Sequence, residues 1–193
     1  MGSRREDVLD AAIDVVGHSG IRGLTHRRVD AAAALPSGST SNLFRTRAAL
    51  LEAVVDRFVD RERHNWEELA LRSMPTTPSE LALVMTLFAH EATGRHRALT
   101  LARYAILVEA GIQPGLRARL LAGGARVNAW FLTWLGAAGS TDPSRHAPLL
   151  MNHWTGVVLH ELAVPDSAFD PSAQFQALTA AVLNPPSGSV GAI

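Results

Sequence analysis

The chain lacks both cysteine and lysine in all of its 193 residues. Without cysteine, disulfide bonds, thiolate metal sites and cysteine nucleophiles are excluded. All 18 basic residues are therefore arginine, a side chain that binds phosphate or guanine through paired hydrogen bonds. A coding bias toward GC-rich codons accounts for the same composition more simply, so the arginines by themselves indicate no function.

Aromatic residues are also scarce, at 6% of the chain, and strand-like alternation is absent. Hydrophobic residues nevertheless make up 47%, with abundant alanine, which favours a helical core of substantial size. The N-terminal sequence MGSRREDVLD has no apolar segment and is not a signal peptide. Apolar runs such as residues 129–138 are too short to cross a bilayer. We therefore expect a cytoplasmic protein with no membrane partner.

The formal net charge is zero, but the charges are unevenly distributed. Residues 1–47 contain seven arginines and five acids, whereas residues 48–73 contain four arginines and six acids. A small cationic excess therefore lies near the N-terminus. It predicts modest, salt-sensitive affinity for nucleic acid.

Residues 24–50 show the pattern of a helix-turn-helix motif. Thr25 is a good helix cap, Pro36 forces a break, Ser37 can cap the next helix, and Thr46 can cap a long one. The Ser, Thr and Asn run after the break suits a surface better than a core. The helices expected here cover about residues 4–16 (ended by Gly17 and Gly20), 26–33, 38–44 and 47–71.

The second part of the chain begins at a Pro/Thr linker over residues 74–78. Ser79 is expected to cap the first helix after it, and Asp142-Pro143 and Asp170-Pro171 are caps followed by first-turn prolines. The expected helices cover about residues 79–93, 95–109, 114–135, 143–163 and 171–183. The predicted fold class is all-α, with domains at residues 1–47 and 74–184, a connecting long helix at 48–73 and a flexible tail at 185–193.

Residues 4–51 resemble the DNA-binding domain of the tetracycline-repressor-like (TetR) transcriptional regulators. Three departures stand out, namely Ser41 in place of a tyrosine, Arg47 in place of a lysine, and the turn 34–36, which reads Ala-Leu-Pro and not Ala-Gly-Val. We expect them to alter the DNA sequence that is recognised, and not the activity. The positions that match in register are Gly20, Leu24, Thr25, Arg27, Val29, Ala31, Gly38, Phe44 and Leu50.

The resemblance implies an N-terminal three-helix helix-turn-helix domain whose third helix enters the major groove of an operator DNA. Arg27 is placed to bind guanine, which would contribute roughly 1–3 kcal/mol of discrimination. Thr25, His26 and Arg47 are better placed for phosphates. A solvated loop is the plain alternative for the hydroxyl run. The groove-facing residues expected on or beside the third helix are Ser37, Ser39, Thr40, Ser41 and Asn42.

The resemblance also implies that the C-terminal helical bundle binds a small-molecule effector and dimerises. Four aromatic side chains are candidates for an apolar or aromatic effector, although helically spaced aromatics are more often core. The last two helices are candidates for the homodimer interface, and the same residues can also complete the monomer core. The effector candidates are Phe88, Tyr104, Trp130 and Trp134, and the interface candidates are Leu149, His153, Trp154, Val157, His160, Phe175, Leu178 and Val182.

An enzyme is not expected, and no cofactor or metal is implied. His146, His153 and His160 are seven residues apart, so neighbours lie ~10.5 Å apart along a helix, too far to share one metal. No glycine-rich phosphate loop and no nucleophile elbow is present. The leading hypothesis is a ligand-released repressor that binds a palindromic operator as a dimer. The alternative is a helical ligand-binding or scaffold protein with a degenerate DNA-binding motif.

Overall fold

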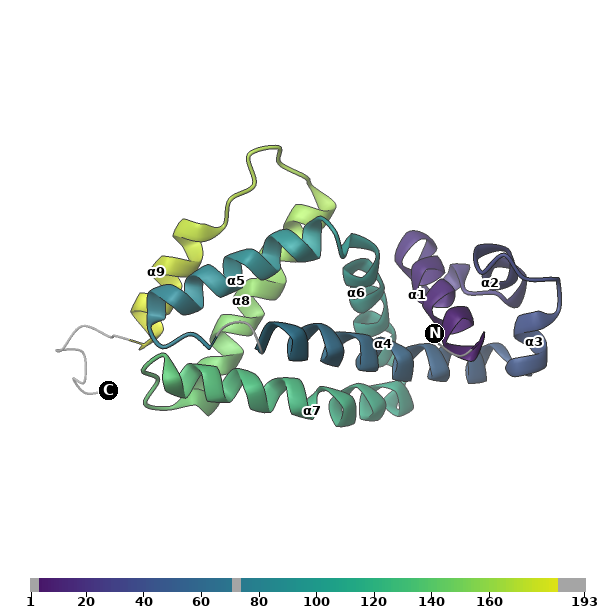
Figure 1. Cartoon of the computed structure of the whole chain (residues 1–193), viewed down its shortest axis with the longest axis horizontal. Coiled ribbons are helices and arrows are strands. Elements are labelled where there is room, and N and C mark those ends of the chain that lie inside the picture. Colours follow the sequence, from purple (N-terminus) through teal and green to yellow (C-terminus); the bar gives the residue numbers. More distant parts are fainter. Residues whose placement is uncertain (1–3, 71–73, 184–193) are drawn as a thin grey trace. The chain divides into compact units, whose positions relative to one another are not determined.

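The computed structural model describes residues 4–70 and 74–183, and over these residues the protein is all-α, as predicted (Figure 1). The predicted tail at residues 185–193 lies outside the described residues, as does the last predicted residue of the fourth helix, Leu71. The helices are α1 (Arg4–Gly23), α2 (His26–Ala32), α3 (Ser39–Leu43), α4 (Arg47–Ala70), α5 (Pro78–Thr93), α6 (Arg97–Ile112), α7 (Pro114–Ala137), α8 (Pro143–Ala163) and α9 (Ser172–Leu183).

The chain divides into two compact units, each assembled from separate stretches of sequence. Unit 1 combines residues 1–66 with 96–125, and unit 2 combines residues 67–95 with 126–193. Helix α6 and the first half of α7 therefore belong to the same compact unit as the helix-turn-helix. The functional division predicted at residues 47 and 73 remains a prediction.

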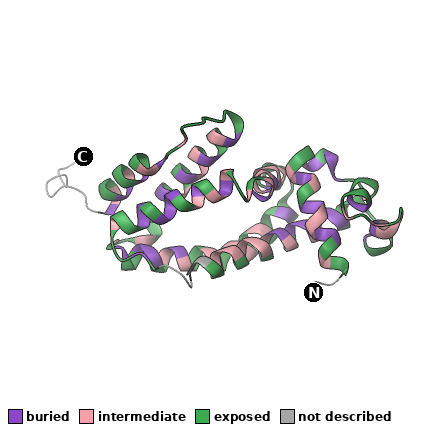
Figure 2. Cartoon of the chain, turned by 45° about the horizontal axis from the view of Figure 1, so that its top comes forward, coloured by how far each residue is buried: buried purple, intermediate pink, exposed green. Residues whose placement is uncertain are grey.

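Unit 1 is built around the apolar stripe of α1, which packs on α4 and α6. Helix α1 buries Val8, Ile13 and Val16, and α6 buries Ile106 in the same cluster. Figure 2 shows how buried positions alternate with exposed ones along each helix. The helices approach closely at Gly17, where an added Cβ would lie 2.2 Å from the carbonyl oxygen of Ala98. The α4 residues in this core are Leu50, Leu51, Val54, Val55 and Phe58.

The first helix is longer than predicted. Gly17 does not end it, because its missing side chain serves the contact with α6 and not a helix stop. Gly20 does interrupt the helix, with φ 66° and ψ 178°, and a short turn leads to Gly23. A positive φ suits glycine, which has no Cβ to clash with the backbone.

Ion pairs connect α4 to its neighbours in unit 1. Arg57 binds Asp10 of α1 through two hydrogen bonds, of 2.9 and 2.8 Å. Arg119 of α7 reaches Asp56 at 2.8 Å and Glu52 at 2.8 Å. Arg103 of α6 lies 3.1 Å from Glu62. Burial raises the pKa of Glu62, and the Arg103 charge opposes that rise.

Unit 2 packs α5 against α8 and α9. Phe175 of α9 and Leu150 of α8 are fully buried, and the indole N–H of Trp154 donates to the carbonyl oxygen of Met85 at 3.1 Å. The predicted cap of α8 is confirmed, since the Asp142 carboxylate accepts from the N–H of Arg145 at 3.1 Å.

The predicted cap of α5 is wrong by two residues. Thr77, and not Ser79, accepts from the N–H of Glu80 at 3.2 Å. The physical reason is Pro78, which has no N–H to satisfy and a φ suited to the first helical position, so the cap must precede it.

Candidate nucleic-acid interface

A buried carboxylate joins the two short helices of the helix-turn-helix. Asp30 is 3% exposed, and its oxygens accept hydrogen bonds from the Gly38 N–H (2.8 Å), the Thr40 N–H (2.7 Å) and the Thr40 hydroxyl (2.6 Å). These N–H groups belong to the first turn of α3, where no backbone acceptor is present. Asp30 therefore caps α3 from a neighbouring helix.

The hydrogen bonds also keep Asp30 charged. Burial by itself raises the pKa of this carboxyl, but the bonds from Thr40 and Gly38 and the charge of His26 lower it further than burial raises it. The net pKa is below the ordinary aspartate value. Asp30 was not among the predicted site residues, because its partners lie eight and ten positions away, beyond the range of local cap rules.

The turn between α2 and α3 contains two residues with left-handed backbone. Gly38 has φ 92° and precedes α3, and Ala34 has φ 52°, unusual for a residue with a Cβ. Helix α3 begins at Ser39, with no side-chain cap from its own N-cap residue, Gly38. The prediction that Ser37 caps this helix is therefore wrong, since Asp30 takes that role.

The predicted recognition residues differ in how far they reach the surface. Ser37 and Asn42 are exposed, and Ser39 and Ser41 are half-buried. The Ser41 hydroxyl donates to the Gly38 carbonyl oxygen at 2.9 Å, so its oxygen can still accept a bond. Thr40 is fully buried and bound to Asp30, so its side chain supports α3 from the inside.

The start of α2 carries Thr25, His26 and Arg27. Thr25 and Arg27 are exposed, and the Thr25 hydroxyl accepts from the N–H of Arg28 at 3.3 Å, as expected of a cap. His26 Nε2 lies 2.8 Å from the carbonyl oxygen of Phe44 and donates to it. A neutral imidazole then has only an acceptor at Nδ1, so only the protonated ring can donate to a phosphate.

Arg47, predicted to contact phosphate, is bound within the protein. Its Nε donates to the Leu24 carbonyl oxygen at 3.0 Å, and its Nη2 donates to the Ile21 carbonyl oxygen. The side chain therefore fastens the start of α4 to the end of α1. Thr46 caps α4 as expected, since its hydroxyl accepts from the Ala49 N–H at 3.1 Å.

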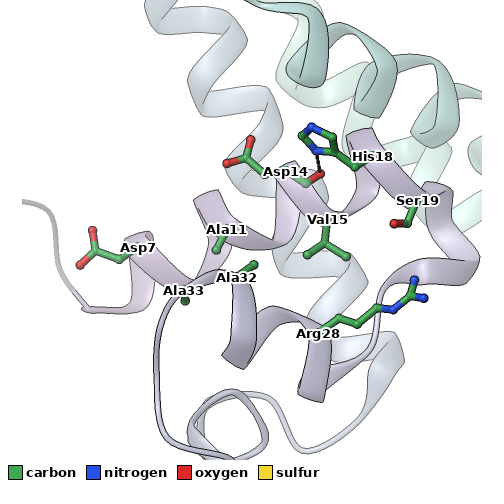
Figure 3. Close-up of a pocket in the computed structure, with 9 residues that line it drawn as sticks. All are labelled: Asp7, Ala11, Asp14, Val15, His18, Ser19, Arg28, Ala32 and Ala33. Atoms are coloured by element: carbon green, nitrogen blue, oxygen red, sulfur yellow. Dashed lines mark hydrogen bonds between the residues drawn. The ribbon is translucent and has the colours of Figure 1, made fainter.

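A groove of about 540 Å³ lies between α1 and α2 (Figure 3). Arg28 extends along it toward Ser19, and the His18 ring donates to the Asp14 carbonyl oxygen at 2.7 Å. None of the predicted DNA-contact residues lines this groove. Its lining residues are Asp7, Ala11, Asp14, Val15, His18, Ser19, Arg28, Ala32 and Ala33.

The effector candidates are divided between the two units. Phe88, Trp130 and Trp134 lie in unit 2, where Trp134 is buried and the other two are half-buried. Tyr104 lies in unit 1 and is half-buried; burial raises the pKa of its phenol.

The interface candidates fall into two groups. Trp154 and Phe175 are buried within unit 2 and serve its own core. Leu149, His153 and His160 are exposed on α8. Val157, Leu178 and Val182 are half-buried.

Together, these elements define an all-α protein with a helix-turn-helix near its N-terminus and further helices after it. Residues 76–185, more than half of the chain, match the family described as "Tetracyclin repressor-like, C-terminal domain". The chain therefore belongs to the TetR family of transcriptional regulators, as the sequence pattern predicted. Members of this family are generally DNA-binding proteins without enzymatic activity.

Solved structures of similar proteins support this assignment. A TetR family member from Streptomyces coelicolor A3 is 28% identical, with a TM-score of 0.69 over 94% of this chain and 99% of that chain. The multidrug binding protein EbrR, complexed with ethidium, is 26% identical, with a TM-score of 0.65 over 93% of this chain and 98% of that chain. A transcriptional regulator from Rhodococcus sp. Rha1 has a TM-score of 0.77 over 94% and 96% and, at 19% identity, shows the shared fold alone.

No curated protein sequence matches the chain significantly. Among the described helices, none is both long enough and apolar enough to cross a membrane. In the same described residues, no cluster of three or more His, Asp or Glu side chains is arranged to hold a metal ion.

Proposed function

We propose that this protein is a ligand-responsive repressor that binds a palindromic operator as a homodimer and leaves it when a small apolar or aromatic effector binds. The observation that carries the proposal is an exposed recognition helix, fixed by Asp30, in a chain of the TetR family. A helix of this kind fits the major groove, and two-fold dimers bind palindromic half-sites.

The proposed base contacts come from the exposed side of α3 and from α2. Ser37, Ser39 and Asn42 face the bases, with Asn42 suited to adenine and Ser41 limited to accepting. Arg27 binds guanine, while Thr25 and His26 contact phosphates. Thr40 is not among the proposed contacts because it is buried. Arg47 is exposed, and its bond to the Leu24 carbonyl oxygen supports the motif.

Gel shifts against genomic fragments, including the promoter beside the protein's own gene, test the proposal. We expect the protein to bind one or a few labelled fragments at low salt. The same fragment without label should displace each of them from the protein. Arg27→Ala should relax the preference at one base position while retaining most non-specific affinity. No binding to any fragment at low salt would favour the alternative of a helical ligand-binding protein with a degenerate DNA-binding motif.

The proposed dimer interface is the exposed face of α8. Leu149, His153, Gly156 and His160 recur at helical spacing on that face, and an added Cβ at Gly156 would meet nothing within 4 Å. The glycine allows a partner helix to approach closely. The half-buried Val157, Leu178 and Val182 extend the proposed contact along α8 and α9.

Gly156→Arg tests this interface, since a long side chain there would block a partner while fitting the single chain. The matched control is Gly124→Arg, on α7, where an added Cβ also meets nothing within 4 Å. We expect light scattering to show a dimer for the wild type and for Gly124→Arg, and a monomer for Gly156→Arg. A dimeric Gly156→Arg variant would place the interface elsewhere.

The proposed effector is an aromatic small molecule. EbrR, at 26–27% identity, has been solved with the aromatic dyes ethidium and proflavin. We propose that Phe88, Trp130 and Trp134, which all belong to unit 2, contact the corresponding effector here. Titration of ethidium or proflavin into the protein–DNA complex should release the DNA at saturating dye. Release that requires dye concentrations able to strip DNA from an unrelated DNA-binding protein would contradict the proposal.

A further inference from the structure

The arginines of unit 1 divide into those held by the protein itself and those that remain at its surface. Arg47 donates to the carbonyl oxygens of Leu24 and Ile21, and Arg57 is bound by Asp10. Arg57 cannot bind a DNA phosphate without weakening these contacts, and Arg47 can use only the N–H groups that its two bonds leave free. Another exposed arginine near the far end of α3 can therefore add a phosphate contact.

Arg5 lies at that end of α3. Its guanidinium carbon is 5.3 Å from the ring centroid of Phe44, within the range of a cation–π interaction. Phe44 is only 5% exposed, whereas Arg5 is exposed. A guanidinium that lies over a ring can still donate from its N–H edge, which is the part that binds phosphate.

Phe44 places Arg5 relative to the recognition helix. It is the C-cap residue of α3, its N–H donates to the Thr40 carbonyl oxygen at 2.8 Å, and its own carbonyl oxygen accepts from His26. The N-terminal turn of α1 therefore meets the end of α3 at the Phe44 ring, and the start of α2 meets it at the Phe44 carbonyl oxygen. When a helix lies in the major groove, the groove walls beside its ends are phosphate backbone.

We propose that Arg5, positioned by the Phe44 ring, contacts a DNA phosphate next to the C-terminal end of α3. The inference rests on the proposed function, since it assumes that α3 enters the major groove. It adds a contact from α1, outside the helix-turn-helix, and it assigns Phe44 a positioning role beyond its place in the core.

The local charges favour this contact. Glu6 and Asp10, which follow Arg5 on α1, both face Arg57, at 3.7 and 2.8 Å. Asp7 is two residues along the helix, about 200° around it from Arg5, and lines the groove between α1 and α2. The positive charge of Arg5 is therefore not cancelled by a carboxylate on its own side of α1.

The test compares Arg5→Ala with Arg4→Ala in the full chain. Arg4 is adjacent, exposed and of the same charge, but the structure gives it no ring contact, so it controls for long-range electrostatics. Binding of a short random-sequence duplex is measured across a range of salt concentrations. For Arg5→Ala we expect a roughly 5-fold loss of affinity and a slope of log K against log salt that is smaller by roughly 1.

A second variant tests the positioning role. Phe44→Leu keeps an apolar side chain but removes the ring, so adding Arg5→Ala to it should cost less affinity than adding Arg5→Ala to the wild type. Circular dichroism confirms that each variant is folded. If the wild type binds the duplex and the Arg5→Ala and Arg4→Ala slopes are equal, the inference is overturned and the proposed function stands. If the wild type binds no duplex at low salt, the proposed function fails and this inference fails with it.

Discussion

Asp30 connects α2 to the first turn of α3 through three hydrogen bonds made inside the protein. Without it, the two Thr40 donors would be left buried and unsatisfied and the Gly38 N–H would lose its acceptor. An unsatisfied buried donor costs more free energy than its hydrogen bond contributes. The position of α3 on unit 1 therefore depends on one carboxylate that faces away from the proposed DNA surface.

Asp30→Ala should lower the free energy of unfolding by about 3 kcal/mol, because two N–H groups and a hydroxyl lose their acceptor. The matched control is Asp7→Ala, an exposed acid whose loss should change stability by no more than about 0.5 kcal/mol. Urea unfolding followed by circular dichroism measures both. Equal stabilities for the two variants would show that the Asp30 bonds do not hold α3 in place.

The lowered pKa of Asp30 predicts how stability depends on pH. The pKa of Asp30 is lower in the folded protein than in the unfolded chain, where it is near 4. The carboxylate therefore stabilises the fold at pH values above about 4, and this contribution is lost as pH falls through the folded pKa. The wild type should therefore lose stability below about pH 4 more steeply than Asp30→Asn, which does not titrate. Parallel curves for the two proteins in that range would contradict the role given to Asp30.

At the residue scale, hydrogen bonds between residues close in sequence were predictable, and bonds between residues far apart in sequence were not. Thr25, Thr46 and Asp142 act as helix caps through bonds to residues three positions ahead, a spacing visible in the sequence. The partners of Asp30 and Arg47 lie across turns or on other helices. No rule of sequence spacing assigns these partners, so the sequence did not reveal the bonds that Thr40 and Arg47 make within the protein.

At the scale of the helix, α7 shows how two adjacent glycines differ. An added Cβ at Gly123 would lie 2.1 Å from Cγ1 of Val59 on α4, whereas one at Gly124 would meet nothing within 4 Å. Arg119 fastens the same half of α7 to Asp56 and Glu52 of α4. Gly123 therefore lets α7 and α4 approach closely, and Gly124 does not contribute to that approach.

Gly123→Ala should destabilise the protein by about 1–3 kcal/mol, because the β-branched Val59 has little freedom to move aside. Gly124→Ala, the matched control, should instead stabilise it by up to about 1 kcal/mol through better helix propensity. Thermal unfolding of the two variants measures the difference. A Gly123→Ala variant as stable as the control would show that α7 and α4 are not in close contact.

The existence of each helix was predictable from apolar periodicity and from proline and cap residues at its start. The face of the helix on which a glycine lies was not predictable. Successive residues are rotated by about 100° around the helix axis, and the sequence does not say which helix packs against which face. The same reason explains why Gly17 resembled a helix end when it is a contact point with Ala98.

At the scale of the molecule, the helix-turn-helix shares its core with helices from later in the chain. Leu99, Ala102 and Ile106 of α6 are buried in the same cluster as Val8 and Val16 of α1. The sequence has a clear linker at residues 74–78, but no local sequence pattern indicates contacts between helices about 90 residues apart.

A fragment of residues 1–66 should therefore fail to unfold cooperatively under conditions where the full chain does. Removing the buried side chains of α6 and α7 forfeits burial on the order of 5–10 kcal/mol, comparable to the whole stability of a small domain. Thermal melts followed by circular dichroism compare the fragment with the full chain. A cooperative melt of the fragment at the temperature of the full chain would show that the helix-turn-helix folds by itself.

The inward bond between Asp30 and Thr40 has a consequence for how such a protein diversifies. The side chains that fix α3 are separate from Ser37, Ser39 and Asn42, which are at least partly exposed. Mutations at those exposed positions are expected to leave the fold intact, so the proposed base contacts can change independently of it. The same separation makes these three positions the natural choice for a randomised library aimed at new DNA targets, with Asp30 and Thr40 held constant.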